Sequence, residues 1–361
     1  MTNKILFIIG STQPNDFHGY LAKSVGADFW VSNVNKYSRF GFVGKIFNTL
    51  KSIISLPRNY DIYLSETVYI IPALAKFLHI IPKKSLIINI SADPVLYALT
   101  TKKKYSIVDK IHRQFIKYVD GFILIGKWGF LLNKLHITKP YFEIGAGISN
   151  PRYNQLLKIR INKKHKNHNI IFVGNISKYQ PSSGRSEYKG FDILLGAFND
   201  VYKKYPDSKL YIIGQCDFTF DNPNIIPVGY KKGHEFVEFL SKMALASYVA
   251  RGDTFPMGSI ETMLAGIPTF VSEFTGTKSI VENANKNFIL PLSSQTLAKA
   301  IIDYFNLSYK EKVELSKKFR MAAKPYATKR IVKTFPNSFN ILVTKIKRTK
   351  NKSNLMQYLT F

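Results

Sequence analysis

Short runs of β-branched and aromatic residues alternate with segments of helical periodicity, and this alternation occurs twice along the chain. Strands that are separated by helices predict βα units around a parallel sheet, and not a sandwich or a helical bundle. Two such series predict two Rossmann-like domains in tandem. The length of 361 residues agrees with this number, because a domain usually holds about 100–200 residues.

The first series predicts five strands, and the second predicts a further set after an irregular segment rich in Asn, Pro, Lys and Arg at residues 149–169. That segment is interpreted as a linker. We therefore expect domains at residues 1–155 and 156–324, followed by a basic helix and tail at 325–361. The first series has strands at Ile5–Ile9, Asp28–Val31, Ile62–Leu64, Leu86–Ile90 and Phe122–Ile125, and the second runs from the strand Ile170–Val173 to the helix Thr296–Asn306.

The positive charge is unevenly distributed. Residues 1–166 hold 25 Lys+Arg and 8 Asp+Glu, residues 167–314 hold 15 of each, and residues 315–361 hold 12 basic residues and no acid. A neutral middle between two basic ends predicts that one domain and the tail meet an anionic partner. An anionic membrane surface and nucleic acid are both attracted by such a field.

The sequence predicts a protein of the cytoplasm, peripheral to the membrane. Cys216 is the single cysteine, so an internal disulfide is excluded and a reducing compartment is favoured. The apolar run Ile5–Ile9 is shorter than a signal-peptide core. The run Val68–Pro82 is interrupted by Pro72 and Lys76, and it falls short of the roughly 20 apolar residues that span a bilayer.

The segment from Asp253 to Pro268 carries the most chemical information. Asp253 follows a predicted strand, at the end where open α/β sheets bind ligands. Glu261 falls in the first turn of a short helix, which Ser259 is expected to cap and Gly266 to end. Two carboxylates therefore flank a loop of exposed amides, a combination that suits hydroxyl and phosphate groups.

A second stretch adds positive charge. Gly174 and Asn175 form a turn after a strand, and Arg185 and Lys189 precede an amphipathic helix. Two cations beside a helix N-terminus are suited to bind a diphosphate.

With these motifs in this order, the chain resembles the retaining glycosyltransferases of family 4, which have the GT-B fold. The resemblance rests on Val173-Gly174, on Lys189-Gly190, and on the acid-x7-Glu motif from Asp253 to Glu261 followed by Ala265-Gly-Ile-Pro268. It covers nearly the whole second domain and is looser in the first. It implies an α/β protein of two Rossmann-like domains facing a cleft, whose C-terminal helix crosses back to the first domain.

The resemblance also implies residue roles for transfer from a nucleotide-diphosphate sugar with retention of configuration. Glu261 would bind the ribose, Asp253 and the following amides would hold the sugar, and Lys189 would neutralise the leaving diphosphate. No cofactor is required, and the absence of an Asp-x-Asp triplet predicts no metal site. The predicted catalytic residues are Asp253, Lys189, Arg185 and Asp93, and the predicted donor-binding residues are Glu261, Gly174, Asn175, Val228, Gly229, Thr254, Phe255, Pro256, Met257, Gly258, Ser259 and Gly19.

The chain departs from the family pattern at three places. Asn175 stands where an arginine is common, and Arg185 from a longer loop is expected to replace it. Asp253 stands where glutamate is more frequent. The first domain lacks the usual glycine pair after its first strand and offers Gly10 and then His18-Gly19 at the start of a helix. Asp93 is the candidate acceptor-side residue, with a plain Asp-Pro turn as the alternative.

The partners that we expect are a nucleotide sugar and a glycan or lipid-linked acceptor beside an anionic membrane surface, with nucleic acid disfavoured. The segment Gly41–Ile54 is amphipathic, and base rates favour packing of its apolar side on the sheet over insertion into a membrane interface. Two alternatives stay open. One is the same chemistry on a soluble protein or glycan, and the other is a non-catalytic GT-B-like binding protein with a basic face.

Overall fold

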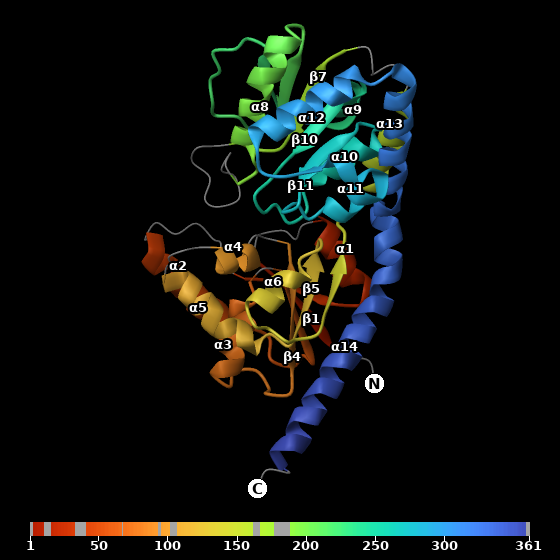
Figure 1. Ribbon diagram of the computed structural model, residues 1–361. Coiled ribbons are helices and arrows are strands. Elements are labelled where there is room, and N and C mark those ends of the chain that lie inside the picture. Colours follow the sequence, from red (N-terminus) through yellow and green to blue (C-terminus); the bar gives the residue numbers. More distant parts are fainter. Residues whose placement is uncertain are drawn as a thin grey trace. The chain divides into compact units, whose positions relative to one another are not determined.

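The computed structural model describes residues 3–10, 16–32, 41–66, 68–92, 95–101, 107–161, 167–176 and 188–358. These residues form two compact units (Figure 1). The first unit contains residues 1–144 and 332–361, and the second contains residues 145–331. Each unit is built on its own six-stranded sheet.

The sheet of the first unit has the order β2-β1-β3-β4-β5-β6, and every pair of neighbours is parallel. Strands β1, β3, β4 and β5 are almost entirely buried because helices lie on both faces of the sheet, as the continuous apolar runs in their sequences indicate. The strands are β1 (Ile5–Ile9), β2 (Asp28–Val31), β3 (Ile62–Glu66), β4 (Leu86–Ser91), β5 (Gly121–Ile125) and β6 (Tyr141–Ile144).

Helices α2 and α3 contribute to a core on one face of this sheet, where Ile53 and Ile71 pack with Leu6 and Tyr63. The described helices of this part of the chain are α1 (Asp16–Ser24), α2 (Gly41–Ile54), α3 (Ile70–Phe77), α4 (Val95–Thr101), α5 (Ile107–Phe115) and α6 (Gly129–Lys134).

Helix α14 (Thr328–Tyr358) completes the first unit, to which its residues from Val332 onward belong. Phe335, Phe339, Leu342 and Ile346 are buried at helical spacing, so one stripe of the helix faces the sheet. The rings of Phe335 and Phe142 lie 6.0 Å apart. The expected basic helix is therefore one long helix, and Pro336 lies inside it.

Helix α2 differs from the expectation that its apolar side packs on the sheet. Ile46, Phe47, Leu50 and Ile54 are 47–67% exposed. Ile53 is buried, so α2 contacts the core through a different face. A continuous apolar stripe is consequently presented to the solvent.

The sheet of the second unit has the order β12-β11-β10-β7-β8-β9 and is again entirely parallel. Its strands are β7 (Asn169–Val173), β8 (Lys209–Ile213), β9 (Ile225–Gly229), β10 (Leu245–Tyr248), β11 (Thr269–Ser272) and β12 (Ile289–Leu290). Its helices are α7 (Asn150–Leu157), α8 (Phe191–Lys204), α9 (Gly233–Ser241), α10 (Met257–Leu264), α11 (Lys278–Ala284), α12 (Ser294–Asn306) and α13 (Tyr309–Ala323).

The segment that the composition suggested as a linker contains α7, and the second unit already begins at residue 145. Hydrogen bonds account for this earlier boundary: the Ile148 N–H donates to the Tyr326 carbonyl, and the Thr328 N–H donates to the Ile148 carbonyl. Strand β6 and helices α6, α7 and α11 are further elements that the sequence did not predict. No described helix combines the length and the apolar character that a membrane span requires.

Candidate functional site

A cavity of about 380 Å³ lies in the second unit at the carboxyl ends of β7 and β10. Parallel sheets bind ligands at this edge, because the strand ends and the helix N-termini that follow them present their polar groups there. The lining contains Lys189 and Asp253, two of the predicted catalytic residues, and seven of the twelve predicted donor-binding residues. The donor-binding residues in the lining are Gly174, Asn175, Phe255, Pro256, Met257, Gly258 and Glu261, and the remaining lining residues are Phe172, Val173, Tyr248 and Ala250.

The N-terminus of α10 forms one wall of this cavity. The helix begins at Met257 with Pro256 as its N-cap, so the expectation that Ser259 caps it is wrong. The Ser259 hydroxyl is buried and donates to the Pro256 carbonyl at 2.7 Å. A Cβ atom on Gly258 would lie 2.7 Å from the Val173 carbonyl oxygen, so only glycine allows α10 to approach β7 this closely.

Lys189 and Asp253 supply opposite charges to the same cavity. Burial lowers the pKa of Lys189, and the negative charge of Asp253 opposes this shift. Burial raises the pKa of Asp253, opposed by the charge of Lys189 and by a hydrogen bond from the Phe255 N–H. The lysine therefore gives the cavity a desolvated cation, which is the arrangement that strengthens binding of a phosphate group.

Glu261 forms an ion pair that the sequence did not reveal. Its Oε1 accepts a hydrogen bond from Arg152 Nη1 of α7 at 2.8 Å. Burial raises the pKa of Glu261, and the charge and hydrogen bond of Arg152 oppose this shift. Arg152 also lies over the Phe236 ring, 4.5 Å from its centroid. The sequence could not predict this ion pair, because Arg152 lies 109 residues from Glu261 in a segment without a recognisable motif.

Tyr248 lines the cavity and is another residue that the sequence did not single out. Its hydroxyl accepts a hydrogen bond from the Val173 N–H at 3.2 Å. Burial, with the nearby charge of Glu261, raises the pKa of Tyr248 well above its usual value. The phenol therefore stays neutral and joins β10 to the end of β7.

The other predicted donor residues have more distant positions. Asn175 Oδ1 accepts a hydrogen bond from the Gln215 N–H at 3.0 Å, which fixes the turn after β7. Val228 and Gly229 end β9, and neither they nor Thr254 and Ser259 line the cavity. Arg185 and Asp93 lie outside the residues that the structure describes.

Gly19 belongs to the first unit, where it lies in α1 beside a buried pair of titratable residues. Nδ1 of His18 is 2.6 Å from Oε1 of Glu66, the last residue of β3. Oε2 of Glu66 is buried and has no hydrogen-bond partner among the described residues. The sequence placed His18 at the start of a helix but gave no sign of its partner.

The cavity of the second unit offers a partly buried ammonium group, a helix N-terminus and two carboxylates. An ammonium group and backbone N–H groups bind phosphate oxygens, and carboxylates accept hydrogen bonds from hydroxyl groups. A ligand with both a phosphate and vicinal hydroxyls would satisfy each of these groups.

Comparison with known proteins agrees with a site for such a ligand. Residues 167–306 match the family model for glycosyl transferases group 1, which supports this family for the second unit. An uncharacterized glycosyltransferase from Haemophilus influenzae is 24% identical over 198 residues, which are 51% of this chain. The match spans only about half of that curated relative, 52% of its length.

Solved structures resemble both units. HepE from Anabaena, in complex with UDP and glucose, has a TM-score of 0.64 and 15% identity, and the match covers 95% of this chain and 99% of HepE. Sucrose-phosphate synthase from Thermosynechococcus elongatus has a TM-score of 0.69 and 11% identity, over 94% of this chain and 99% of that chain. Together with the two parallel sheets, these neighbours confirm the predicted GT-B fold.

Proposed function

We propose that this chain is a glycosyltransferase that transfers a sugar from a nucleotide-diphosphate donor to an acceptor. The observation that carries the proposal is the grouping of Lys189, Asp253 and Glu261 around the N-terminus of α10 in one cavity. Glu261 binds the ribose hydroxyls, Asp253 binds the sugar, and Lys189 binds the diphosphate. A non-catalytic binding module would not require a partly desolvated lysine in one cavity with the partly buried Asp253 and the buried Glu261.

We propose uridine as the base, since structures of HepE hold UDP and UDP-glucose. The family-model match and the motif from Asp253 to Glu261 support a finer assignment to the retaining enzymes of family 4. In a retaining transfer the bond between the anomeric carbon and the diphosphate breaks, and the acceptor oxygen bonds on the same face of the sugar. The departing phosphate oxygen takes the acceptor proton, and Lys189 stabilises the charge that develops on the leaving group.

A membrane-proximal, lipid-linked acceptor is favoured over a soluble glycan or protein by the exposed stripe of α2. Phe47 and Ile54 are each 67% exposed, and Lys51 lies beside them on the exposed part of the helix. An apolar stripe with adjacent lysine is typical of a helix that lies in a membrane interface. We infer that the enzyme is peripheral at the cytoplasmic face.

The His18–Glu66 pair is our candidate for the acceptor side of the first unit. A carboxylate that holds Nδ1 of a histidine fixes the tautomer and leaves Nε2 to contact a hydroxyl group. The pair lies at the carboxyl edge of the sheet, where β3 ends and α1 begins. Asp93, which the sequence nominated for this side, keeps that role as a hypothesis.

The experiment that tests the donor site is a thermal-shift panel of UDP-, GDP- and ADP-sugars with the wild type and Glu261→Gln, without added metal. We expect stabilisation by UDP-sugars only, lost in the variant. No shift with any donor would contradict the proposed activity. The anomeric configuration of the product, read by proton NMR, separates retention from inversion.

The acceptor proposal has its own test, co-sedimentation with vesicles of phosphatidylglycerol in phosphatidylcholine. A Phe47→Ser, Ile54→Ser double variant is expected to bind these vesicles about tenfold more weakly or worse, because each exposed side chain contributes apolar burial. Met321→Ser, at an exposed apolar residue of the second unit, is the control. Equal binding of all three proteins would remove the support for a membrane-proximal acceptor.

A further inference from the structure

A second cavity, of about 820 Å³, lies in the first unit at the edge where its parallel strands begin. Its lining comes from residues just before β1, β3, β4 and β6 and from the last turns of α14. This is the edge opposite the carboxyl ends of the strands, where the His18–Glu66 pair lies. The cavity therefore belongs neither to the donor site nor to the candidate acceptor site.

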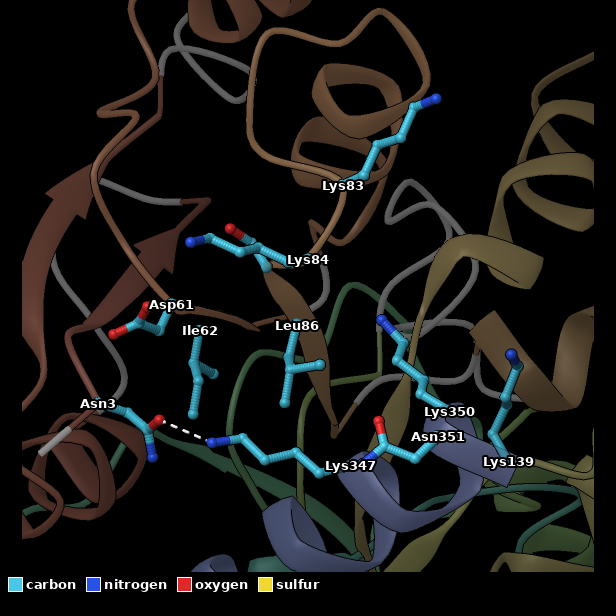
Figure 2. Close-up of a pocket in the computed structure, with 11 residues that line it drawn as sticks. Asn3, Asp61, Ile62, Lys83, Lys84, Leu86, Lys139, Lys347, Lys350 and Asn351 are labelled. Atoms are coloured by element: carbon cyan, nitrogen blue, oxygen red, sulfur yellow. Dashed lines mark hydrogen bonds between the residues drawn. The ribbon is translucent and has the colours of Figure 1, made fainter. Parts of the chain in front are cut away.

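Lysines dominate the lining: Lys83, Lys84, Lys139, Lys347 and Lys350, against the single carboxylate of Asp61. Figure 2 shows Lys84, Lys347 and Lys350 around the side chains of Ile62 and Leu86, with Lys139 farther out and the ammonium group of Lys83 directed away from the others. Among the described residues, Lys83, Lys84 and Lys139 form no ion pair. Nζ of Lys347 donates to the neutral Asn3 Oδ1 at 3.0 Å. Most of these ammonium groups therefore lack an opposite charge.

Lys350 is held by a buried carboxylate that fixes the wall made by α14. Asp120 Oδ1 lies 2.8 Å from Nζ of Lys350, and its Oδ2 accepts hydrogen bonds from Lys76 Nζ and the Ile87 N–H. A Cβ atom on Gly121 would lie 2.5 Å from Ile346 Cδ1, so α14 packs directly against the start of β5. The lysines of α14 are thus positioned by the core and not by a loose tail.

We propose that this cavity binds a ligand that carries two or more phosphate groups. Ammonium groups gathered around a concave surface repel one another, and an anion that bridges them removes this repulsion. Each ammonium presents three N–H donors to phosphate oxygens without a fixed plane, so several phosphates at different angles can be bound. A single multiply phosphorylated molecule or several neighbouring phospholipid headgroups would supply this chemistry.

Lysine footprinting of the full wild-type chain tests the site without any substitution. Acetylation rates are measured by mass spectrometry with and without inorganic tripolyphosphate at physiological salt. We expect slower acetylation of Lys84, Lys139 and Lys347, while the exposed lysines Lys286 and Lys310 of the second unit keep their rates. Equal slowing at both sets of lysines would overturn the proposal, and so would acetylation rates that neither tripolyphosphate nor the anionic vesicles described below change.

Footprinting also separates this cavity from the donor site, because tripolyphosphate bound there would protect Lys189 instead. Calorimetry then compares two variants of equal charge, Lys84→Gln/Lys139→Gln/Lys347→Gln and Lys286→Gln/Lys310→Gln/Lys318→Gln. We expect the first to bind tripolyphosphate at least about tenfold more weakly and the second to bind like the wild type. Equal weakening in both variants would indicate net charge alone and refute a built site.

A parallel arm replaces tripolyphosphate with vesicles of phosphatidylglycerol in phosphatidylcholine, and with pure phosphatidylcholine as the control. Protection of the cavity lysines by tripolyphosphate identifies a free phosphorylated ligand. Protection by the anionic vesicles alone identifies lipid headgroups as the source of the phosphates. Absence of protection in both arms contradicts the site.

Discussion

Replacement of Glu261 by glutamine separates ligand binding at the donor cavity from support of the fold. The variant keeps the shape of the side chain but removes the charge that faces Arg152 at 2.8 Å. Breaking a fully buried ion pair costs about 3–5 kcal/mol. The Arg152 side chain is 29% exposed and keeps its contact with the Phe236 ring, so we expect a smaller loss of about 1–2 kcal/mol in the free energy of unfolding.

The effect on donor binding should be larger. A hydrogen bond to a charged acceptor contributes about 1.5–3 kcal/mol, and the proposed contact uses two ribose hydroxyls. Glutamine retains one neutral acceptor oxygen, so we expect a loss of about 2–3 kcal/mol. This corresponds to a roughly 30- to 150-fold rise in the dissociation constant of the UDP-sugar.

Arg152→Gln is the matched control, because it breaks the same ion pair but leaves the carboxylate in place. Calorimetric titration of both variants with UDP-glucose, alongside urea denaturation, gives the two quantities separately. We expect similar losses of stability but much weaker donor binding in Glu261→Gln only. Equal weakening in both variants would show that Glu261 acts only through Arg152, and wild-type affinity in Glu261→Gln would refute the ribose contact.

The donor affinity of the control variant Arg152→Gln should also depend on pH in a characteristic way. Arg152 opposes the burial that raises the pKa of Glu261, so its removal raises that pKa further. The carboxyl group of Arg152→Gln then takes up a proton at a higher pH than in the wild type. Donor affinity of this variant should therefore fall earlier as the pH is lowered, whereas a structural role for Glu261 would leave the two pH profiles parallel.

Four further changes test other parts of the molecule. Lys189→Gln should lower kcat by about 100-fold and donor affinity by less, since the cation acts on charge that develops in the transition state; equal losses in both would contradict this role. Gly258→Ala should cost about 1–3 kcal/mol in urea denaturation, because its Cβ would overlap the Val173 carbonyl, and unchanged stability would show that α10 can shift freely. Burial lowers the pKa of Lys76 to about 8, although the charge of Asp120 opposes this shift. Between about pH 8 and the higher pKa of Lys76 in the unfolded chain, the folded protein binds fewer protons, so its free energy of unfolding should rise by on the order of 1 kcal/mol per pH unit. The Lys76→Met variant should lack this slope. His18→Gln should lower kcat at saturating donor while donor binding stays unchanged, and wild-type turnover would exclude the pair from the reaction.

The fold was largely predictable because its strands are continuous apolar runs. The buried strands β1, β4 and β5 were each located to within a residue at either end, since a parallel strand covered on both faces has no polar alternation to obscure it. Strand β6 was missed because Tyr141–Ile144 is short and half-exposed and contains Glu143. Helix α7 was missed because a run of Asn, Pro and Arg has no helical apolar period, and its place in the second unit depends on contacts far away in sequence.

The grouping of residues in the proposed donor cavity was predictable for a related reason. Asp253 and Glu261 lie in one continuous segment, in which the loop and the Gly266 turn have recognisable local signals although the start of α10 was misplaced. Arg152, Tyr248 and the His18–Glu66 pair carry no such signal, because each acquires its partner only when helices and strands distant in sequence are brought together. The spacing of residues along the chain thus predicts sites that are built on one continuous segment. It does not predict contacts between residues that the fold brings together from distant segments.

The excess of basic residues in the first unit also shows that the sequence does not reveal which distant residues pair with one another. The sequence assigned this charge to an anionic partner as a whole, yet the structure divides it between two uses. Lys76 and Lys350 neutralise the buried carboxylate of Asp120 and secure α14, so their charges are internal to the fold. Among the residues that the structure describes, Lys84 and Lys139 face a cavity without such a partner, so their charges are available to the ligand that we propose. A total charge therefore predicts only that an anionic partner exists, whereas the pairing of individual lysines suggests where such a partner would bind.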